Sequence, residues 1–95
     1  MTSLSVVITC FNEGKLLYNA LNSLYNQVDP DFEMIIINDY SQDHITNKIC
    51  KEIESKKGVL VIWNKTNMGL SVSRNIAIGK AKGDIIVLLD ADDVL

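Results

Sequence analysis

The order of hydrophobic and polar residues along the chain changes between two periods. Four short runs are apolar at consecutive positions and rich in β-branched residues; they cover residues 4–10, 32–39, 59–64 and 84–90. Such runs predict strands that are buried on both faces. Between them, apolar residues recur every three or four positions, which predicts amphipathic helices. The predicted helical segments are residues 12–27, 41–58 and 70–83.

Each predicted helix has a face that we expect to pack against the sheet. These faces contain Leu16, Leu17, Ala20, Leu21 and Leu24 in the first helix, Ile45, Ile49 and Ile53 in the second, and Val72, Ile76 and Ala77 in the third. Asp43 is predicted to cap the second helix, because its side chain can accept from a free N–H group of the first turn. Gly58 and Gly83 are predicted to end the second and third helices.

The order β-α-β-α-β-α-β predicts one domain over residues 1–95. Apolar strands separated by helices favour an α/β fold with three α/β/α layers, in which a Rossmann-like, mainly parallel sheet has helices on both faces. In such sheets ligands bind beyond the carboxyl ends of the strands, near the switch in strand order. The segments expected at this edge are residues 9–13, 38–43, 64–69 and 90–93, and three of the four are rich in Asp, Asn or hydroxyl groups.

Composition narrows the classes of function. The net charge is −3, with 47% hydrophobic and 22% charged residues, which fits a folded domain. The chain lacks the basic surface expected of a nucleic-acid-binding protein, so we expect no nucleic-acid partner. No apolar stretch approaches the roughly 20 residues of a membrane span. Cys10 and Cys50 lack metal-ligand spacing, and we expect reduced thiols and a cytoplasmic location.

Two acidic groups stand at predicted strand ends. Turn and capping roles explain Ser41 and Asp43, whereas Asp39 lies at the strand tip, where its carboxylate could accept from a base N–H or a sugar hydroxyl. Asp90, Asp92 and Asp93 form either a solvated turn or a site for Mg²⁺ or Mn²⁺, which bind carboxylate and phosphate oxygens.

Three further residues have both a structural and a ligand-binding interpretation. Gly69 precedes a helix and permits a tight turn or a close backbone approach. Arg74 is either a surface residue or a guanidinium directed at a base or phosphate. Phe11 is either a core aromatic or a ring that stacks on a planar base.

Together these segments resemble the family 2 glycosyltransferases, which have a GT-A fold. The resemblance covers nearly the whole chain and is carried by LSVVITCFNEGKLLYNALNSLYNQ (residues 4–27), FEMIIINDYSQD (32–43) and NKTNMGLSVSRNIAIGKAKGDIIVLLDADDVL (64–95). It implies a nucleotide-binding set and a metal-binding set. The first set is Thr9, Phe11, Glu13, Asp39, Arg74 and Asp90, and the second is Asp92 and Asp93.

The resemblance also implies a role for most of these residues. Thr9 and Phe11 would lie against the base, with Phe11 stacking on it, and Asp39 would accept from the base. Arg74 would contact the base or the diphosphate, and Asp90 would lie near the ribose. Asp92, with Asp93, would hold the Mn²⁺ or Mg²⁺ that bridges the diphosphate.

For the whole protein, the resemblance implies transfer of a sugar from a nucleotide-diphospho-sugar to a saccharide or lipid-linked acceptor, as in polysaccharide biosynthesis. UDP is the commonest carrier in such enzymes. The usual catalytic base, a later Asp or Glu, would lie beyond Leu95. We therefore expect a fold truncated after the fourth strand, which binds donor nucleotide without transferring sugar. The full-length protein would be cytoplasmic or peripheral to a membrane.

Four positions depart from the family pattern. Thr9 stands where proline is common, and Phe11 replaces a frequent tyrosine. Asn38 and Tyr40 replace the first aspartate and the glycine of the family's V-D-D-G-S-x-D motif. The last two changes bear on the shape of the base-binding loop.

Two other functions fit parts of the sequence. A receiver-like phosphoacceptor domain also has acidic strand ends, but its acidic pair should follow the first strand, where Asn12 and Glu13 stand. A non-catalytic nucleotide- or partner-binding module fits as well. Whether the chain is part of an enzyme or a binding module, an exposed sheet edge predicts a homo-oligomer, because an uncovered strand can pair with a second chain.

Overall fold

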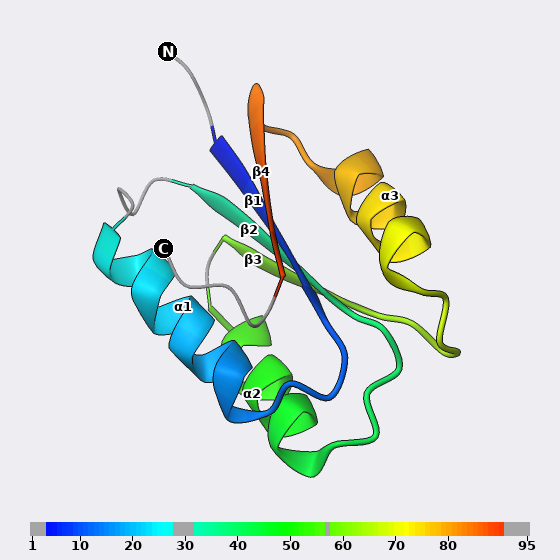
Figure 1. The fold of residues 1–95 in the computed structure, drawn as a ribbon. Helices are drawn as coiled ribbons and strands as arrows, with labels where there is room; N and C mark the ends of the chain where they lie inside the picture. Colours follow the sequence, from blue (N-terminus) through cyan, green and yellow to red (C-terminus); the bar gives the residue numbers. More distant parts are fainter. Residues whose placement is uncertain (1–3, 28–31, 57, 91–95) are drawn as a thin grey trace.

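The computed structural model describes residues 4–27, 32–56 and 58–90. The elements, in chain order, are β1 (Leu4–Cys10), α1 (Lys15–Gln27), β2 (Glu33–Asn38), α2 (His44–Glu54), β3 (Val59–Trp63), α3 (Leu70–Lys80) and β4 (Ile85–Asp90). The strands lie in the order β3-β2-β1-β4, and every neighbouring pair is parallel (Figure 1). The predicted α/β fold with a parallel sheet is therefore confirmed.

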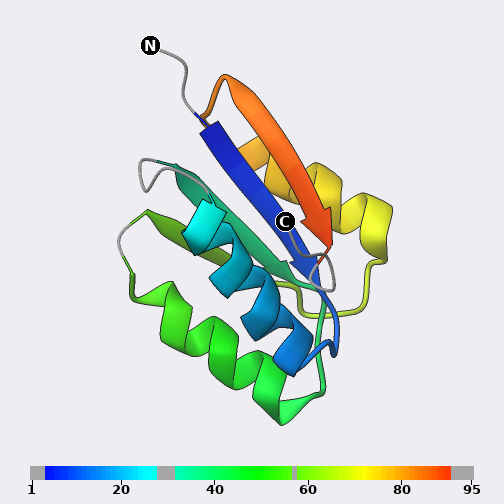
Figure 2. The same ribbon diagram turned by 60° about the vertical axis from the view of Figure 1, so that its left-hand side comes forward.

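Helices cover both faces of the sheet. α1 and α2 lie together on one face, and α3 lies on the other (Figure 1, Figure 2). The core under α1 and α2 includes Ile8 and Leu17, whereas the smaller core under α3 includes Val7 and Ala77, and all four residues are fully buried. Alternate residues of β1 thus face opposite cores, as expected for a strand covered on both faces. Within the described ranges, no helix is long and apolar enough to cross a membrane.

The parallel register brings the carboxyl ends of the strands to one edge of the sheet. Thr9 is paired with Ile37 in β2 and with Asp90 in β4, and Asn38 is paired with Trp63 in β3. β2 lies on one side of β1 and β4 lies on the other, so the strand order switches beside β1. The ends of β1 and β4 are therefore where a ligand of an open parallel sheet is expected.

In each helix, the prediction that a residue packs inward is wrong at one position. Leu16, Ile45 and Val72 are 49%, 53% and 47% exposed, respectively. In α2 and α3 the buried positions are instead the next residues, Thr46 and Ser73, both fully buried. Their hydroxyl groups are hydrogen-bonded to other buried or loop residues, which removes the penalty of burying a polar group.

The two glycines predicted as helix ends lie beyond them. α2 ends at Glu54 and α3 ends at Lys80. Gly58 has a φ of +82° and turns the chain into β3, a conformation that favours glycine. Gly83 allows a close approach to β1, because a Cβ at this position would lie 2.7 Å from the backbone nitrogen of Ser5.

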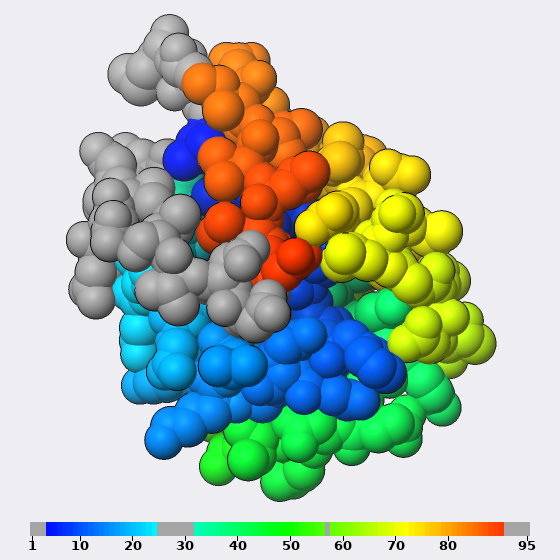
Figure 3. Space-filling model, viewed as in Figure 1, coloured from blue at the N-terminus to red at the C-terminus, as the bar shows by residue number. Residues whose placement is uncertain are grey.

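β3 and β4 form the edges of the described sheet and are less buried than predicted. Ile85, Ile86 and Leu88 of β4 are 50%, 38% and 43% exposed. Figure 3 shows β4, in orange and red, at the surface beside α3. Burial on both faces is complete only in the central strands, because α3 packs mainly on β1 and β2. Self-association through a sheet edge stays a prediction.

Candidate functional site

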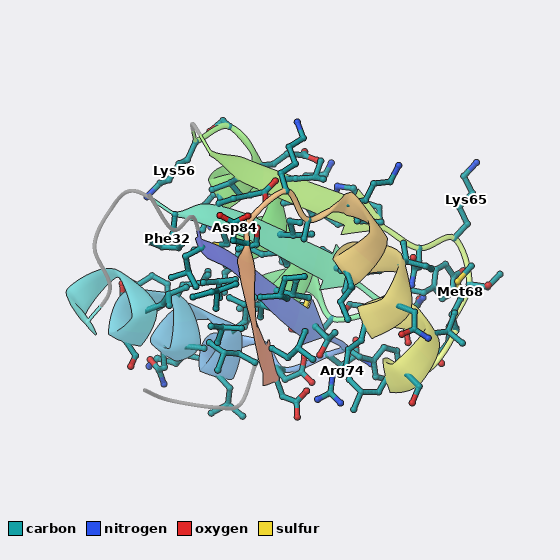
Figure 4. All side chains as sticks on the ribbon, turned by 90° about the horizontal axis from the view of Figure 1, so that it is seen from above. Phe32, Lys56, Lys65, Met68, Arg74 and Asp84 are labelled. Carbon is teal, nitrogen blue, oxygen red and sulfur yellow. The ribbon has the colours of Figure 1, made fainter. Side chains whose placement is uncertain are left out.

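A cavity of about 390 Å³ opens at the carboxyl ends of β1 and β4. Five of the six candidate nucleotide-binding residues line it, namely Thr9, Phe11, Glu13, Asp39 and Asp90. The sixth, Arg74, does not line the cavity, but its side chain points from α3 toward the carboxyl end of β4 (Figure 4). The strand ends thus bring together residues that are separated by up to 81 positions in the sequence.

Asp90 links Thr9 to Arg74 at the edge of the cavity. One carboxylate oxygen of Asp90, Oδ1, accepts from Thr9 Oγ1 (3.1 Å) and from Arg74 Nη2 (2.7 Å). The Arg74 and Asp90 side chains are 32% and 37% exposed, and an ion pair this accessible to water contributes only about 0–1 kcal/mol. Arg74 Nε is buried and has no hydrogen-bond partner among the described residues. The guanidinium therefore has both an unused donor and a weakly held one.

Asp39 is buried at the opposite side of the same cavity and is only 6% exposed. Its Oδ1 accepts from Met68 N–H (2.7 Å) and Asn64 Nδ2 (2.9 Å), and its Oδ2 accepts from Gly69 N–H (2.9 Å). Burial raises the pKa of Asp39, but these hydrogen bonds and one from Ser73 outweigh burial, so the pKa lies below its ordinary value. Asp39 is therefore an ionised acceptor whose partners lie in the loop between β3 and α3.

The loop after β1 is fixed by Asn12. This residue has a φ of +59°, and its Oδ1 accepts from the backbone N–H groups of Gln42 (2.7 Å) and Asp43 (2.9 Å). The Phe11 N–H donates to the Glu13 carboxylate within the same loop. Phe11 is 42% exposed and so is not a core residue. Its ring is available at the cavity, which favours the stacking interpretation.

A buried polar network lies behind the cavity. Asn38 Oδ1 accepts from Ser41 N–H (2.9 Å), and Asn38 Nδ2 donates to Asn47 Oδ1 (2.9 Å) and to Cys50 Sγ (3.5 Å). Cys50 Sγ lies 3.8 Å from Cys10 Sγ, and both cysteines are free thiols. The hydrogen bond with Cys50, together with burial, raises the pKa of Cys10 above its ordinary value. The aspartate of the family motif would place an acceptor where Asn38 donates, so asparagine suits this network.

Tyr40 follows Asp39 and stands where the family motif has glycine. Its φ of +61° lies in the left-handed region, which costs a non-glycine residue about 1–2 kcal/mol. The side chain is 48% exposed. The loop therefore keeps the backbone conformation that glycine favours, although it carries a tyrosine.

The expected metal ligands, Asp92 and Asp93, lie outside the described residues. Within residues 4–27, 32–56 and 58–90, no group of three His, Cys, Asp or Glu side chains is placed to hold a metal. The three carboxylates that line the cavity, those of Glu13, Asp39 and Asp90, therefore do not form such a group.

Sequence reasoning missed part of the cavity wall. The remaining lining residues are Cys10, Asn67, Gly69 and Leu70. Cys10, Asn67 and Gly69 belong to segments that were expected at this edge, and Gly69 was also expected to permit a close approach. Leu70 lies outside those segments, because its place at the cavity depends on the packing of α3.

Several known proteins are similar to this chain in sequence and in fold. The model of the family described as Glycosyl transferase family 2 matches residues 5–95. An uncharacterized glycosyltransferase of Methanocaldococcus jannaschii is 39% identical over 92 residues, which cover 95% of this chain and 32% of that protein. The structure of S. aureus TarS 1–349 in complex with UDP-GlcNAc has a TM-score of 0.86 and 32% identity, over 97% of this chain and 27% of TarS 1–349. GalNAc-T7 with UDP, GalNAc and Mn²⁺ has a TM-score of 0.82 and 32% identity, over 96% of this chain and 18% of that one.

Proposed function

Because the chain belongs to glycosyl transferase family 2, we propose that it forms the donor-binding part of a metal-dependent glycosyltransferase. The enzyme would transfer a sugar from a nucleotide-diphospho-sugar to a saccharide or lipid-linked acceptor. The observation that carries this proposal is the single cavity that joins five of the candidate nucleotide-binding residues, with Arg74 at its edge.

The nucleotide would fill this cavity with its base toward β1 and β2. Phe11 stacks on the base, because its ring is exposed and the loop that carries it is hydrogen-bonded to the start of α2. Thr9 lies against the base, and Asp39 accepts from a base N–H.

The ribose and the diphosphate would lie toward β4. Asp90 accepts from the ribose, and Glu13 lines the cavity between the two ends of the nucleotide. Arg74 offers its weakly held Nη2 to phosphate oxygens, for which a guanidinium has suitable geometry.

We propose UDP as the nucleotide and Mn²⁺ or Mg²⁺ as the metal. TarS is in complex with UDP-GlcNAc, and GalNAc-T7 is with UDP, GalNAc and Mn²⁺, which supports this choice. Asp92 and Asp93 would hold the ion next to Asp90. When bound, a divalent ion neutralises the negative charge on the leaving diphosphate.

The catalytic base and the acceptor site are proposed to belong to other parts of a longer protein. The chain spans about a third of the curated relative described above. The 95-residue chain alone would therefore bind donor nucleotide without transferring sugar.

Calorimetric titration of UDP into the chain, with Mn²⁺ and then with EDTA, tests the proposal. We expect binding that needs the metal and that is lost in Asp92→Ala. Glu52→Gln is a matched control, because Glu52 is exposed on α2 and does not line the cavity. Binding that is equal in EDTA, or unchanged in Asp92→Ala, would overturn the metal site. Sugar transfer by the isolated chain would overturn the assignment of the base elsewhere.

A further inference from the structure

The loop between β3 and α3, residues 64–69, donates three hydrogen bonds to the side chain of Asp39, the residue that follows β2. All three of its hydrogen bonds to Asp39 are 2.7–2.9 Å long and come from different residues, Asn64, Met68 and Gly69. Hydrogen bonds to a charged acceptor contribute more to stability than neutral ones. Asp39 is thus the main side-chain anchor of this loop in the described structure.

The same loop provides the start of α3. Gly69 is the N-cap of α3 and has a φ of +86°, and it has no side chain with which to cap the helix. The Asp39 carboxylate receives the N–H of this N-cap residue, so a negative charge lies at the positive end of the helix dipole. Asn64 Nδ2, which donates to Asp39, also donates to Ser73 Oγ (3.1 Å) in the first turn.

Arg74 follows Ser73 directly. Ser73 is fully buried, so the position of the first turn is fixed on that side, and Arg74 then reaches Asp90 of β4. A continuous series of contacts therefore runs from the tip of β2, through the loop and the start of α3, to the guanidinium at the cavity edge.

We propose that Asp39 is a positioning residue, whose carboxylate fixes the loop 64–69 and the start of α3 and thereby places Arg74 at the donor cavity. This role is separate from the base contact proposed above, because its hydrogen bonds form without ligand. Its effect on donor binding rests on the proposed function, whereas its effect on the loop does not.

Amide exchange in the ligand-free protein tests the structural half of this proposal. Asp39→Asn keeps the shape of the side chain but replaces one acceptor oxygen with a donor. We expect the Met68 and Gly69 amides to exchange at least about tenfold faster, the change that corresponds to 1.4 kcal/mol. Amides of Val7 and Ile36 in the central strands should keep their protection, and Glu52→Gln should change neither group. Unchanged exchange at Met68 and Gly69 would overturn the proposal.

A milder variant covers the case in which Asp39→Asn does not fold. Asn64→Ala removes one donor to Asp39 and the bond to Ser73, and leaves the carboxylate in place. We expect a smaller acceleration at Met68 and Gly69, and a shift of the Arg74 Nε–H NMR signal. If neither changes, the loop and Arg74 are not coupled through Asp39.

Two ligands separate positioning from base contact. Inorganic pyrophosphate has no base. If Asp39 acts through Arg74, Asp39→Asn weakens the binding of pyrophosphate by about the same factor as the binding of UDP, each measured by titration with Mn²⁺. The loss should not add to that of Arg74→Gln in the double variant, since both act on one contact. Loss of UDP binding alone would assign Asp39 to the base only. If the unmodified chain binds neither ligand, the proposed function fails, and the exchange experiment still decides the positioning role.

Discussion

The N-termini of α2 and α3 are anchored in different ways. α2 starts with a cap of its own: Asp43 Oδ2 accepts from Thr46 N–H (2.8 Å) and from the Thr46 hydroxyl (2.6 Å), three residues away. α3 starts at a glycine and depends on Asp39, which is 30 residues distant from Gly69. A local cap leaves a signature in the sequence, whereas a remote anchor does not. The remote anchor, in turn, lets one strand end control the position of a helix on the other face of the sheet.

The largest expected effect comes from removing the remote anchor. Asp39→Ala leaves the N–H groups of Met68 and Gly69 without their acceptor, and we expect a loss of about 2–4 kcal/mol in the free energy of unfolding at pH 7. Asp43→Ala should cost less, because Asp43 is closer to solvent and water can replace it. Urea unfolding of both variants checks this order. Equal losses would contradict the distinction between the two helix starts.

The anchor of α2 can be tested at Gly14, which lies beside it. Gly14 has a φ of +57°, and a Cβ there would lie 3.1 Å from Asp43 Oδ2. We expect Gly14→Ala to lower the free energy of unfolding by about 1–2 kcal/mol, the cost of a left-handed backbone.

Gly79 provides the matched control for Gly14. It lies inside α3, and a Cβ there would meet nothing within 4 Å. Gly79→Ala should therefore raise stability by about 0.5–1 kcal/mol, since alanine is the better helix former. Thermal or urea unfolding that gave both substitutions the same sign would contradict the local geometry.

The carboxyl groups of Asp39 and Asp43 also predict that the free energy of unfolding depends on pH. Hydrogen bonds from the Thr46 hydroxyl and N–H lower the pKa of Asp43, and hydrogen bonds lower that of Asp39 in spite of burial, which raises it. A lowered pKa gives stability that is present above the unfolded value of about 3.9 and is lost as the pH falls through the folded value. Stability should thus decline below about pH 4, and less steeply in Asp39→Asn. Urea unfolding at pH 5, 4 and 3 measures this, and parallel curves for both proteins would contradict it.

The smallest effect is expected at Tyr40, between the two anchors. Tyr40→Gly relieves the left-handed backbone but makes the unfolded chain more flexible, so the net gain should be at most about 1 kcal/mol. A clear loss on urea unfolding would mean that the exposed ring makes contacts that stabilise the loop.

Most of the fold could be predicted from local patterns. The seven elements occur in the predicted order, because apolar runs and helical spacing depend on neighbouring residues. The buried faces of α2 and α3 could not be predicted fully. Thr46 and Ser73 are buried in place of Ile45 and Val72, because their hydroxyls have hydrogen-bond partners in loops, Gly14 for Thr46 and Asn64 for Ser73. Gly83 was assigned to a helix end, although its role is a close approach to Ser5, which is far away in the sequence.

The candidate site was predictable to a similar extent. The rule that ligands bind at the carboxyl ends of parallel strands indicated the edge at which Thr9, Phe11, Asp39 and Asp90 now meet. The hydrogen bonds that Asp39 accepts from the Met68 and Gly69 N–H groups were not predictable, because they depend on how the loop 64–69 folds.

The central claim is that donor nucleotide binds at the carboxyl ends of β1 and β4. An NMR titration of the ¹⁵N-labelled chain with UDP and Mg²⁺, a diamagnetic ion, tests this most directly. The account predicts that amide signals of residues 9–13, 39, 67–70 and 90 shift together along one binding curve. Shifts confined to the separate groove between α1 and α2, lined by residues such as Tyr18 and Ile53, or no shifts at all, would contradict it.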